Sequence, residues 1–137
     1  MASPSMAARW RIREGPRMTP EAIVVDFCAA WDRLDWPAIH AHLSDDIFYH
    51  NIPTDPTQGL DAFKAVFAAF PVSAARFEIH HIAAAGNIVL TERTDRFVLA
   101  GKDIVVRVMG TFEIQDGKIA VWRDYFDMAH LVGQMPG

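Results

Sequence analysis

The stretch Val121-Trp122-Arg123-Asp124-Tyr125-Phe126-Asp127, near the C-terminus, decides how the rest of the chain is interpreted. It has the bulk and aromatic content of a buried strand, yet charged residues stand among the apolar ones. Because alternate side chains of a strand point to opposite faces, Trp122, Asp124 and Phe126 share one face. If that face is the interior one, Asp124 is a carboxylate between aromatic rings, and charges are buried in this way only when they are paired or used. We therefore expect the chain to build a pocket around Asp124.

Upstream of this stretch, apolar and polar residues alternate with a period of two, which predicts antiparallel strands separated by glycine-containing turns. The predicted strands cover 77–82, 88–99, 104–114 and 119–126. A shorter strand is predicted over 47–52. Pro53 and Pro56 close it, because proline cannot donate to a sheet ladder. The segment 53–59 is predicted to be a loop.

The first half of the chain shows helical spacing of its apolar residues. Thr19-Pro20-Glu21 is a helix start, with an N-cap hydroxyl followed by proline, and this helix is predicted to run to about Leu34. Further helices are predicted over 36–43, 60–70 and 128–134. Helices, a strand, a helix and then a run of strands indicate an α+β fold. We expect a cone-shaped, curved, mixed β-sheet packed against the N-terminal helices.

The composition is that of one globular domain: 137 residues, of which 51% are hydrophobic. We expect this domain to span residues 18–137 and to follow a flexible N-terminal extension over residues 1–17. Cys28 is the single cysteine, which excludes an internal disulfide framework and a multi-cysteine metal site. None of the six histidines stands at metal-ligand spacing from another, so no metal is expected.

The charge of the chain is unevenly distributed. Residues 1–17 hold four arginines and one glutamate, a balance of +3, and the remainder holds 13 − 4 = 9 basic and 17 − 1 = 16 acidic residues, a balance of −7. This acidic body argues against nucleic acid as a partner. No apolar run reaches the roughly 20 residues that span a bilayer, so no membrane partner is expected. We expect a soluble, cytoplasmic protein.

Polar residues occupy predicted core positions in three short segments. Tyr49 and Asn51 stand two apart, as do Arg93 and Asp95, and Asp124 is the third case. The alternative is a solvated strand face, since half-exposed antiparallel strands alternate in the same way. For the strand that holds Arg93, this alternative stays open, because the residues of its other face are also polar.

Tyr49-x-Asn51, Thr91-Glu92-Arg93-x-Asp95 and Trp122-Arg123-Asp124-Tyr125-Phe126-Asp127 together resemble the limonene-1,2-epoxide hydrolase family. That family belongs to the wider group of small conical folds similar to nuclear transport factor 2 (NTF2-like, SnoaL-like, a cystatin-like α+β roll). The resemblance implies that Asp124 is a general base, Asp95 a general acid and Arg93 the arginine that bridges them. It further implies that Tyr49 and Asn51 hold the attacking water.

The activity that the resemblance implies is the addition of water to a small, apolar, cyclic or terpenoid epoxide. A vicinal diol would form in one general acid/base step, without a covalent intermediate and without a cofactor. Strand parity gives the expected pocket lining: Phe97, Val106, Val108, Trp122 and Phe126. The resemblance also implies a homodimer that pairs through the exposed sheet face, where Arg107, Met109 and Thr111 are expected.

Two other functions remain open from the sequence. An isomerase or polyketide-cyclase-like enzyme on the same fold would abstract a proton next to a carbonyl and use neutral donors as an oxyanion hole. A non-catalytic domain would use the same pocket only for ligand binding or association. The products formed from an epoxide and from a β,γ-unsaturated ketone distinguish these possibilities.

Overall fold

The computed structural model describes residues 18–135, and the expected N-terminal extension over residues 1–17 lies outside the described residues. The helices of the described part are α2 (Pro20–Asp32), α3 (Trp36–Ala41), α4 (Leu60–Ala69) and α5 (Met128–Gln134). The strands are β1 (Leu43–Ile52), β2 (Thr57–Gln58), β3 (Val72–Ala85), β4 (Ile88–Leu99), β5 (Lys102–Gln115) and β6 (Lys118–Tyr125).

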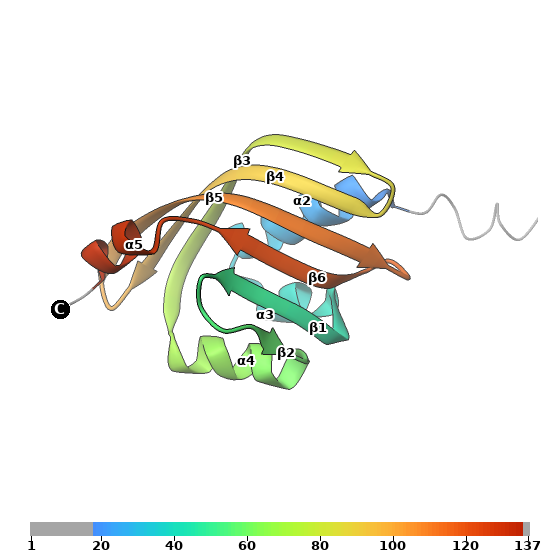
Figure 1. The fold of residues 1–137 in the computed structure, drawn as a ribbon. Helices are drawn as coiled ribbons and strands as arrows, with labels where there is room; N and C mark the ends of the chain where they lie inside the picture. Colours follow the sequence, from blue (N-terminus) through green and yellow to red (C-terminus); the bar gives the residue numbers. More distant parts are fainter. Residues whose placement is uncertain (1–17, 136–137) are drawn as a thin grey trace, which may run out of the picture.

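The strands form a single mixed sheet in the order β2-β1-β6-β5-β4-β3. β1 and β6 run parallel, and the other neighbouring pairs are antiparallel. The sheet curves over α2 and α3, while α5 lies at one end of the molecule (Figure 1). The predicted α+β fold with a curved, mixed sheet is confirmed.

Side-chain caps explain where three of the described helices, α2, α3 and α5, begin. The hydroxyl of Thr19 accepts a hydrogen bond from the backbone N–H of Ala22 at 3.1 Å, as an N-cap residue does. Asp35 and Asp127 cap α3 and α5 in the same way. The predicted start of α2 and the predicted bounds of α5 are confirmed, whereas α3 ends at Ala41 because the chain turns into β1.

The strand bounds differ from the prediction mainly in β1, β2 and β3. β3 covers Val72–Ala85 rather than 77–82, because its alanine-rich ends carry no alternating pattern although they pair with β4. β1 begins at Leu43, four residues earlier than predicted, and the expected loop over 53–59 contains the two-residue strand β2. β6 ends at Tyr125, so Phe126 lies just outside the strand.

The core lies between α2 and the concave face of the sheet. Phe27 of α2 is fully buried, and its ring meets that of Trp122 on β6 edge to face, with 5.1 Å between the ring centroids. Trp31, one helical turn further, stacks on Phe77 of β3 at 4.8 Å. This aromatic packing fixes α2 against the middle of the sheet and leaves room for a cavity beyond it.

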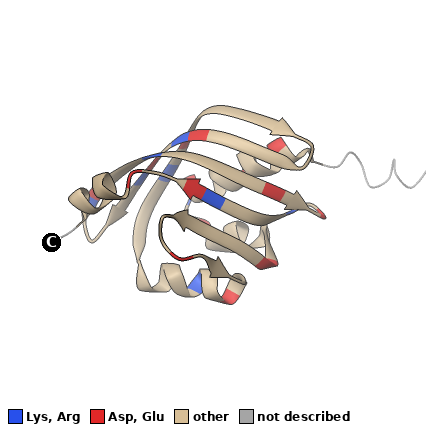
Figure 2. Cartoon of the chain, viewed as in Figure 1, with Lys and Arg blue, Asp and Glu red and all other residues tan. Residues whose placement is uncertain are grey.

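Acidic and basic residues are interspersed along the strands in the view of Figure 2. Within residues 18–135, none of the helices has the length and apolar character needed to cross a membrane. The cytoplasmic location stays a prediction.

Candidate active site

β6 presents Asp124 to the concave side of the sheet. Trp122 and Asp124 are 1% and 4% exposed, whereas the next residue, Tyr125, is 49% exposed. The indole N–H of Trp122 donates to Oδ1 of Asp124 at 2.8 Å. A buried carboxylate is thereby held by a neutral donor on its own strand.

β4 places Thr91, Arg93 and Asp95 on the same concave side, at every second position, and all are at most 5% exposed. Arg93 binds Asp95 through two parallel hydrogen bonds, from Nε to Oδ1 at 2.9 Å and from Nη2 to Oδ2 at 2.8 Å. This is the bidentate geometry that a planar guanidinium makes with a carboxylate. A solvated strand face therefore does not account for these residues.

Arg93 also reaches Asp124, although β5 lies between their two strands. Its Nη2 donates to Oδ2 of Asp124 at 2.8 Å. The guanidinium is fully buried, and the side chains of Asp95 and Asp124 are 8% and 6% exposed. One buried cation thus bridges two largely buried carboxyl groups.

Gly110 of β5 makes this bridge possible. It is the register partner of both Thr91 on β4 and Asp124 on β6, and it stands at an inward-facing position of β5. A Cβ at this position would overlap with Nη1 of Arg93 and with Oδ1 of Asp124. The absence of a side chain at Gly110 therefore leaves the space through which the side chain of Arg93 passes across β5 to Asp124.

Burial and charge together set the protonation of the site. Burial raises the pKa of Asp95 to about 6, although Arg93 and its hydrogen bonds act in the opposite direction and Asp124 adds to the rise. Burial alone would lower the pKa of Arg93, but the two carboxyl groups outweigh it and hold that pKa above its ordinary value. Burial thus favours the protonated form of Asp95, and the two carboxyl groups favour the charged form of Arg93.

Tyr49 and Asn51 come to the site from β1. The parallel register sets Asn51 beside Asp124 and Tyr49 beside Trp122. Nδ2 of Asn51 donates to the hydroxyl of Tyr49 at 2.8 Å. Burial, followed by the charge of Asp124, raises the pKa of Tyr49, so its hydroxyl keeps its proton and can donate it.

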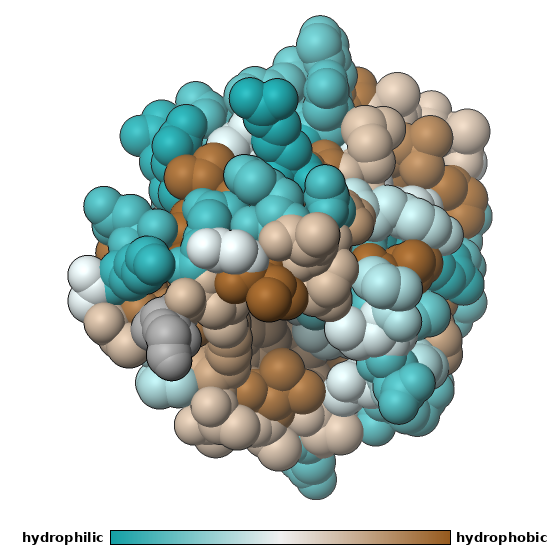
Figure 3. Space-filling view, turned by 60° about the vertical axis from the view of Figure 1, so that its left-hand side comes forward, coloured by the Kyte–Doolittle hydropathy of each residue, from teal (hydrophilic) through white to brown (hydrophobic). Residues whose placement is uncertain are grey.

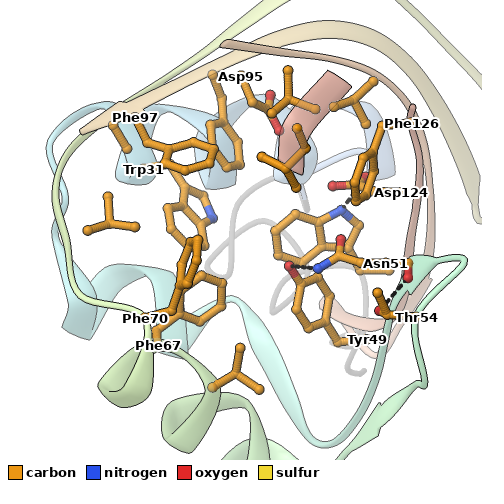
Figure 4. A pocket seen from close by; sticks show the side chains of 18 of the residues that line it. Trp31, Tyr49, Asn51, Thr54, Phe67, Phe70, Asp95, Phe97, Asp124 and Phe126 are labelled. Carbon is orange, nitrogen blue, oxygen red and sulfur yellow. Dashed lines mark hydrogen bonds between the residues drawn. The ribbon is translucent and has the colours of Figure 1, made fainter. Parts of the chain in front are cut away.

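The two carboxyl groups lie on the wall of a cavity of about 510 Å³. Figure 4 shows Asp124, Asn51 and Tyr49 on one side of it, and Figure 3 shows a hollow bordered mainly by apolar residues. The five expected pocket residues all line this cavity: Phe97, Val106, Val108, Trp122 and Phe126. Lining residues that the sequence reasoning missed include Trp31, Phe67, Phe70, Phe77, Met128 and Leu131.

Two other missed residues support the carboxylate bridge, namely Thr91 and Gly110. Thr91 stands in the segment Thr91-Glu92-Arg93-x-Asp95, but the sequence alone assigns it no role. A glycine inside an alternating strand, such as Gly110, is a signal of close approach. Among residues 18–135, no group of three or more His, Cys, Asp or Glu side chains is arranged to hold a metal ion.

Comparison with solved structures defines the class of fold. The chain is similar to an NTF2-like protein of unknown function from Burkholderia pseudomallei, with a TM-score of 0.76 and 17% identity over 88% of this chain and 100% of that one. It is also similar to a putative polyketide cyclase from Pseudomonas putida, with a TM-score of 0.71 and 24% identity over 87% of this chain and 99% of that one. These likenesses establish the NTF2-like fold.

Sequence comparison adds the family. The model of the limonene-1,2-epoxide hydrolase catalytic domain matches residues 18–136. The epoxide hydrolase EphG of Mycobacterium tuberculosis is 38% identical over 104 residues, which are 74% of this chain and 69% of that protein. The solved structure of an LEH-like epoxide hydrolase from M. tuberculosis matches with a TM-score of 0.72 and 32% identity, over 84% of this chain and 87% of that one. The chain belongs to the limonene-1,2-epoxide hydrolase family.

Proposed function

We propose that this protein adds water to a small, apolar, uncharged epoxide, of the cyclic or terpenoid kind that limonene oxide represents, and releases a vicinal diol. The observation that carries this proposal is the buried bridge from Asp95 through Arg93 to Asp124, on the wall of an apolar cavity. Epoxide opening needs a nucleophile at carbon and a proton for the departing oxygen. One ionised and one protonated carboxyl group supply both.

In the proposed step, Asp124 accepts a proton from water while the water oxygen bonds to an epoxide carbon. The carbon–oxygen bond of the epoxide breaks, and Asp95 gives its proton to the departing oxygen. Exchange of one proton with solvent then resets the two carboxyl groups. No bond forms between the enzyme and the substrate, and no cofactor takes part.

The surroundings of the two carboxyl groups support the proposed roles of Asp95 as the acid and Asp124 as the base. With its pKa raised by burial to about 6, the carboxyl of Asp95 is largely protonated in mildly acidic solution, where an ordinary aspartate is ionised. Asp124 has Oδ1 and Oδ2 already fixed by Trp122 and Arg93, so it presents a carboxylate of defined orientation. Preorganised groups of this kind lower a reaction barrier because they need no reorientation during the step.

The attacking water is proposed to lie between Asp124, Tyr49 and Asn51. Asn51 and Asp124 are register partners on adjacent parallel strands, and the amide of Asn51 binds the hydroxyl of Tyr49. A carboxylate, an amide and a hydroxyl offer the acceptors and donors that orient one water molecule.

The cavity supports an uncharged substrate. Its volume of about 510 Å³ lies within the range of about 300–1,000 Å³ that is common for small-molecule sites. Asp95 and Asp124 are the charged side chains among its lining residues, and both are committed to the proposed chemistry. Phe67, Phe70 and Phe97 form the opposite side, which suits a hydrocarbon ring (Figure 4).

The experiment is diol formation from limonene oxide and from simple cyclic epoxides, in the presence of a chelator. We expect turnover by the wild type that the chelator does not change. The absence of diol from every epoxide tested would overturn the proposal. Saturable binding without turnover would indicate a ligand-binding domain, and conversion of a β,γ-unsaturated ketone would indicate an isomerase.

We further propose that two copies pair through the outer face of the sheet. Met109 is 53% exposed there, beside Tyr125 of β6, and Leu90 of β4 stands opposite Thr111. Arg107 is exposed on the same face of β5. Sedimentation is expected to give a dimer for the wild type and a monomer for Met109→Lys, while Val132→Lys on α5 remains dimeric. A monomeric wild type would contradict this pairing.

A further inference from the structure

The hydroxyl of Thr91 makes two hydrogen bonds at the back of the carboxylate bridge. Nη1 of Arg93 lies 3.0 Å from Oγ1 of Thr91, and the carbonyl oxygen of Gly110 lies 3.2 Å from the same atom. Because a guanidinium only donates, Oγ1 must accept from Arg93, and its own proton must therefore go to Gly110. Thr91 is 1% exposed, so this orientation is fixed away from solvent.

Arg93 needs this contact because its carboxylate partners occupy only one side of the guanidinium. Asp95 takes Nε and Nη2, and Asp124 takes Nη2 again, which leaves Nη1 to Thr91. Cζ of Arg93 also lies over the rings of Phe77 and Phe112, at 5.3 and 5.8 Å from the ring centroids. Those rings favour the charge of the group, but they offer no hydrogen-bond acceptor to Nη1.

Gly110 contributes to the same arrangement in two ways. Its carbonyl oxygen orients the Thr91 hydroxyl, and its missing side chain leaves the space that Nη1 of Arg93 fills. A Cβ at Gly110 would also come within 3.2 Å of Oγ1 of Thr91. Thr91 and Gly110 are therefore a matched pair across neighbouring strands.

We propose that Thr91 is a positioning residue of the proposed epoxide hydrolase: by accepting the hydrogen bond from Nη1, its hydroxyl helps to hold the Arg93 guanidinium in the orientation in which Nη2 serves Asp95 and Asp124 together. Thr91 is absent from the residues that line the cavity, so it acts through Arg93 rather than on the substrate. This inference rests on the proposed function for its kinetic test only. The geometry of Arg93 can be tested without any substrate.

Thr91→Val keeps the branched shape and removes the acceptor. We expect kcat to fall about 10- to 100-fold with KM changed less than about threefold, since displacements of about 1 Å cost rates of this order. Thr91→Ser restores the hydroxyl and should return kcat to within about threefold of the wild type. Thr57→Val, at a partly exposed position of β2 outside the cavity lining, is the matched control and should not change kcat.

Nitrogen-15 NMR of the arginine side chains supplies the substrate-free readout. We expect slow rotation about the Nε–Cζ bond of Arg93 in the wild type and in Thr91→Ser, and faster rotation in Thr91→Val, where Nη1 has lost its acceptor. Should Thr91→Val fail to fold, the comparison of Thr91→Ala with Thr91→Ser tests the same point, because these two side chains differ only by the hydroxyl oxygen. The proposal is overturned if the variant without the hydroxyl matches the wild type in kcat and in guanidinium rotation, or if Thr91→Ser is as impaired as that variant. A wild type that hydrolyses no epoxide would refute the proposed function and leave the NMR result to decide the role of Thr91.

Discussion

The indole N–H of Trp122 donates a 2.8 Å hydrogen bond to Oδ1 of Asp124, two residues further along the same face of β6. Arg93 occupies Oδ2 of the same carboxylate. Both oxygens of the proposed base are therefore oriented before any substrate arrives. The orientation of the proposed base therefore depends on its two hydrogen-bond donors as well as on its position in β6.

We predict that Trp122→Phe lowers kcat about 10- to 100-fold, because the ring remains but the donor to Asp124 is lost. The smaller ring should also destabilise the fold by about 1–3 kcal/mol, since Trp122 is 1% exposed in the aromatic core. Single-turnover rates and thermal unfolding measure the two effects separately. Trp36→Phe, at a half-buried tryptophan outside the cavity lining, is the matched control and should keep full kcat.

Asp95→Asn and Asp124→Asn are each expected to reduce diol formation by about 10²- to 10⁴-fold, the usual range for loss of a general acid or base. Asparagine is close in size to aspartate, so circular dichroism should show a retained fold. Asp46→Asn, at an exposed position of β1, is the control. Near-wild-type turnover by either site variant would remove that residue from the mechanism.

The pH dependence follows from the protonation of Asp95. Burial raises its pKa from 3.8 to about 6, and the proposed acid works only in its protonated form. The protonated fraction is complete well below that pKa and falls as the pH rises through it. We therefore predict an alkaline limb of kcat/KM with an apparent pKa of about 6, because kcat/KM reports the free enzyme. A profile that stays flat from pH 6 to pH 8 would contradict Asp95 as the acid.

We predict that Gly110→Ala disrupts the bridge between Arg93 and Asp124, because it adds a methyl group where these side chains lie. The new Cβ overlaps with Arg93 and Asp124, so the bridge must shift, and overpacking costs of about 1–3 kcal/mol are typical. We expect kcat/KM to fall at least about 100-fold, with a lower melting temperature. Gly133→Ala on α5 is the control, since a Cβ there meets nothing within 4 Å. Equal activity of the two variants would show that Arg93 does not need the space above Gly110.

The sequence predicted much of this arrangement because strand parity is a local property. Alternation alone places Asp124 beside Trp122 on the inner face, and the turn residues separate the strands. Alternation does not reveal that Arg93 reaches across β5 to Asp124, since the register between strands depends on contacts between residues distant in the chain. The pairing of β1 with β6, which brings Asn51 beside Asp124, is equally non-local. The alanine-rich ends of β3 escaped prediction because they carry little apolar contrast.

Direct attack by water on the epoxide is the central claim, and isotope labelling in a single turnover tests it. Excess enzyme is mixed with a cyclic epoxide in water enriched in oxygen-18, and both the diol and the protein are analysed by mass spectrometry. The mechanism through Asp124 and Asp95 predicts one oxygen-18 atom in the diol from the first turnover and none in the protein. Unlabelled diol together with oxygen-18 in an aspartate carboxyl group would contradict it, because that pattern requires a covalent ester intermediate.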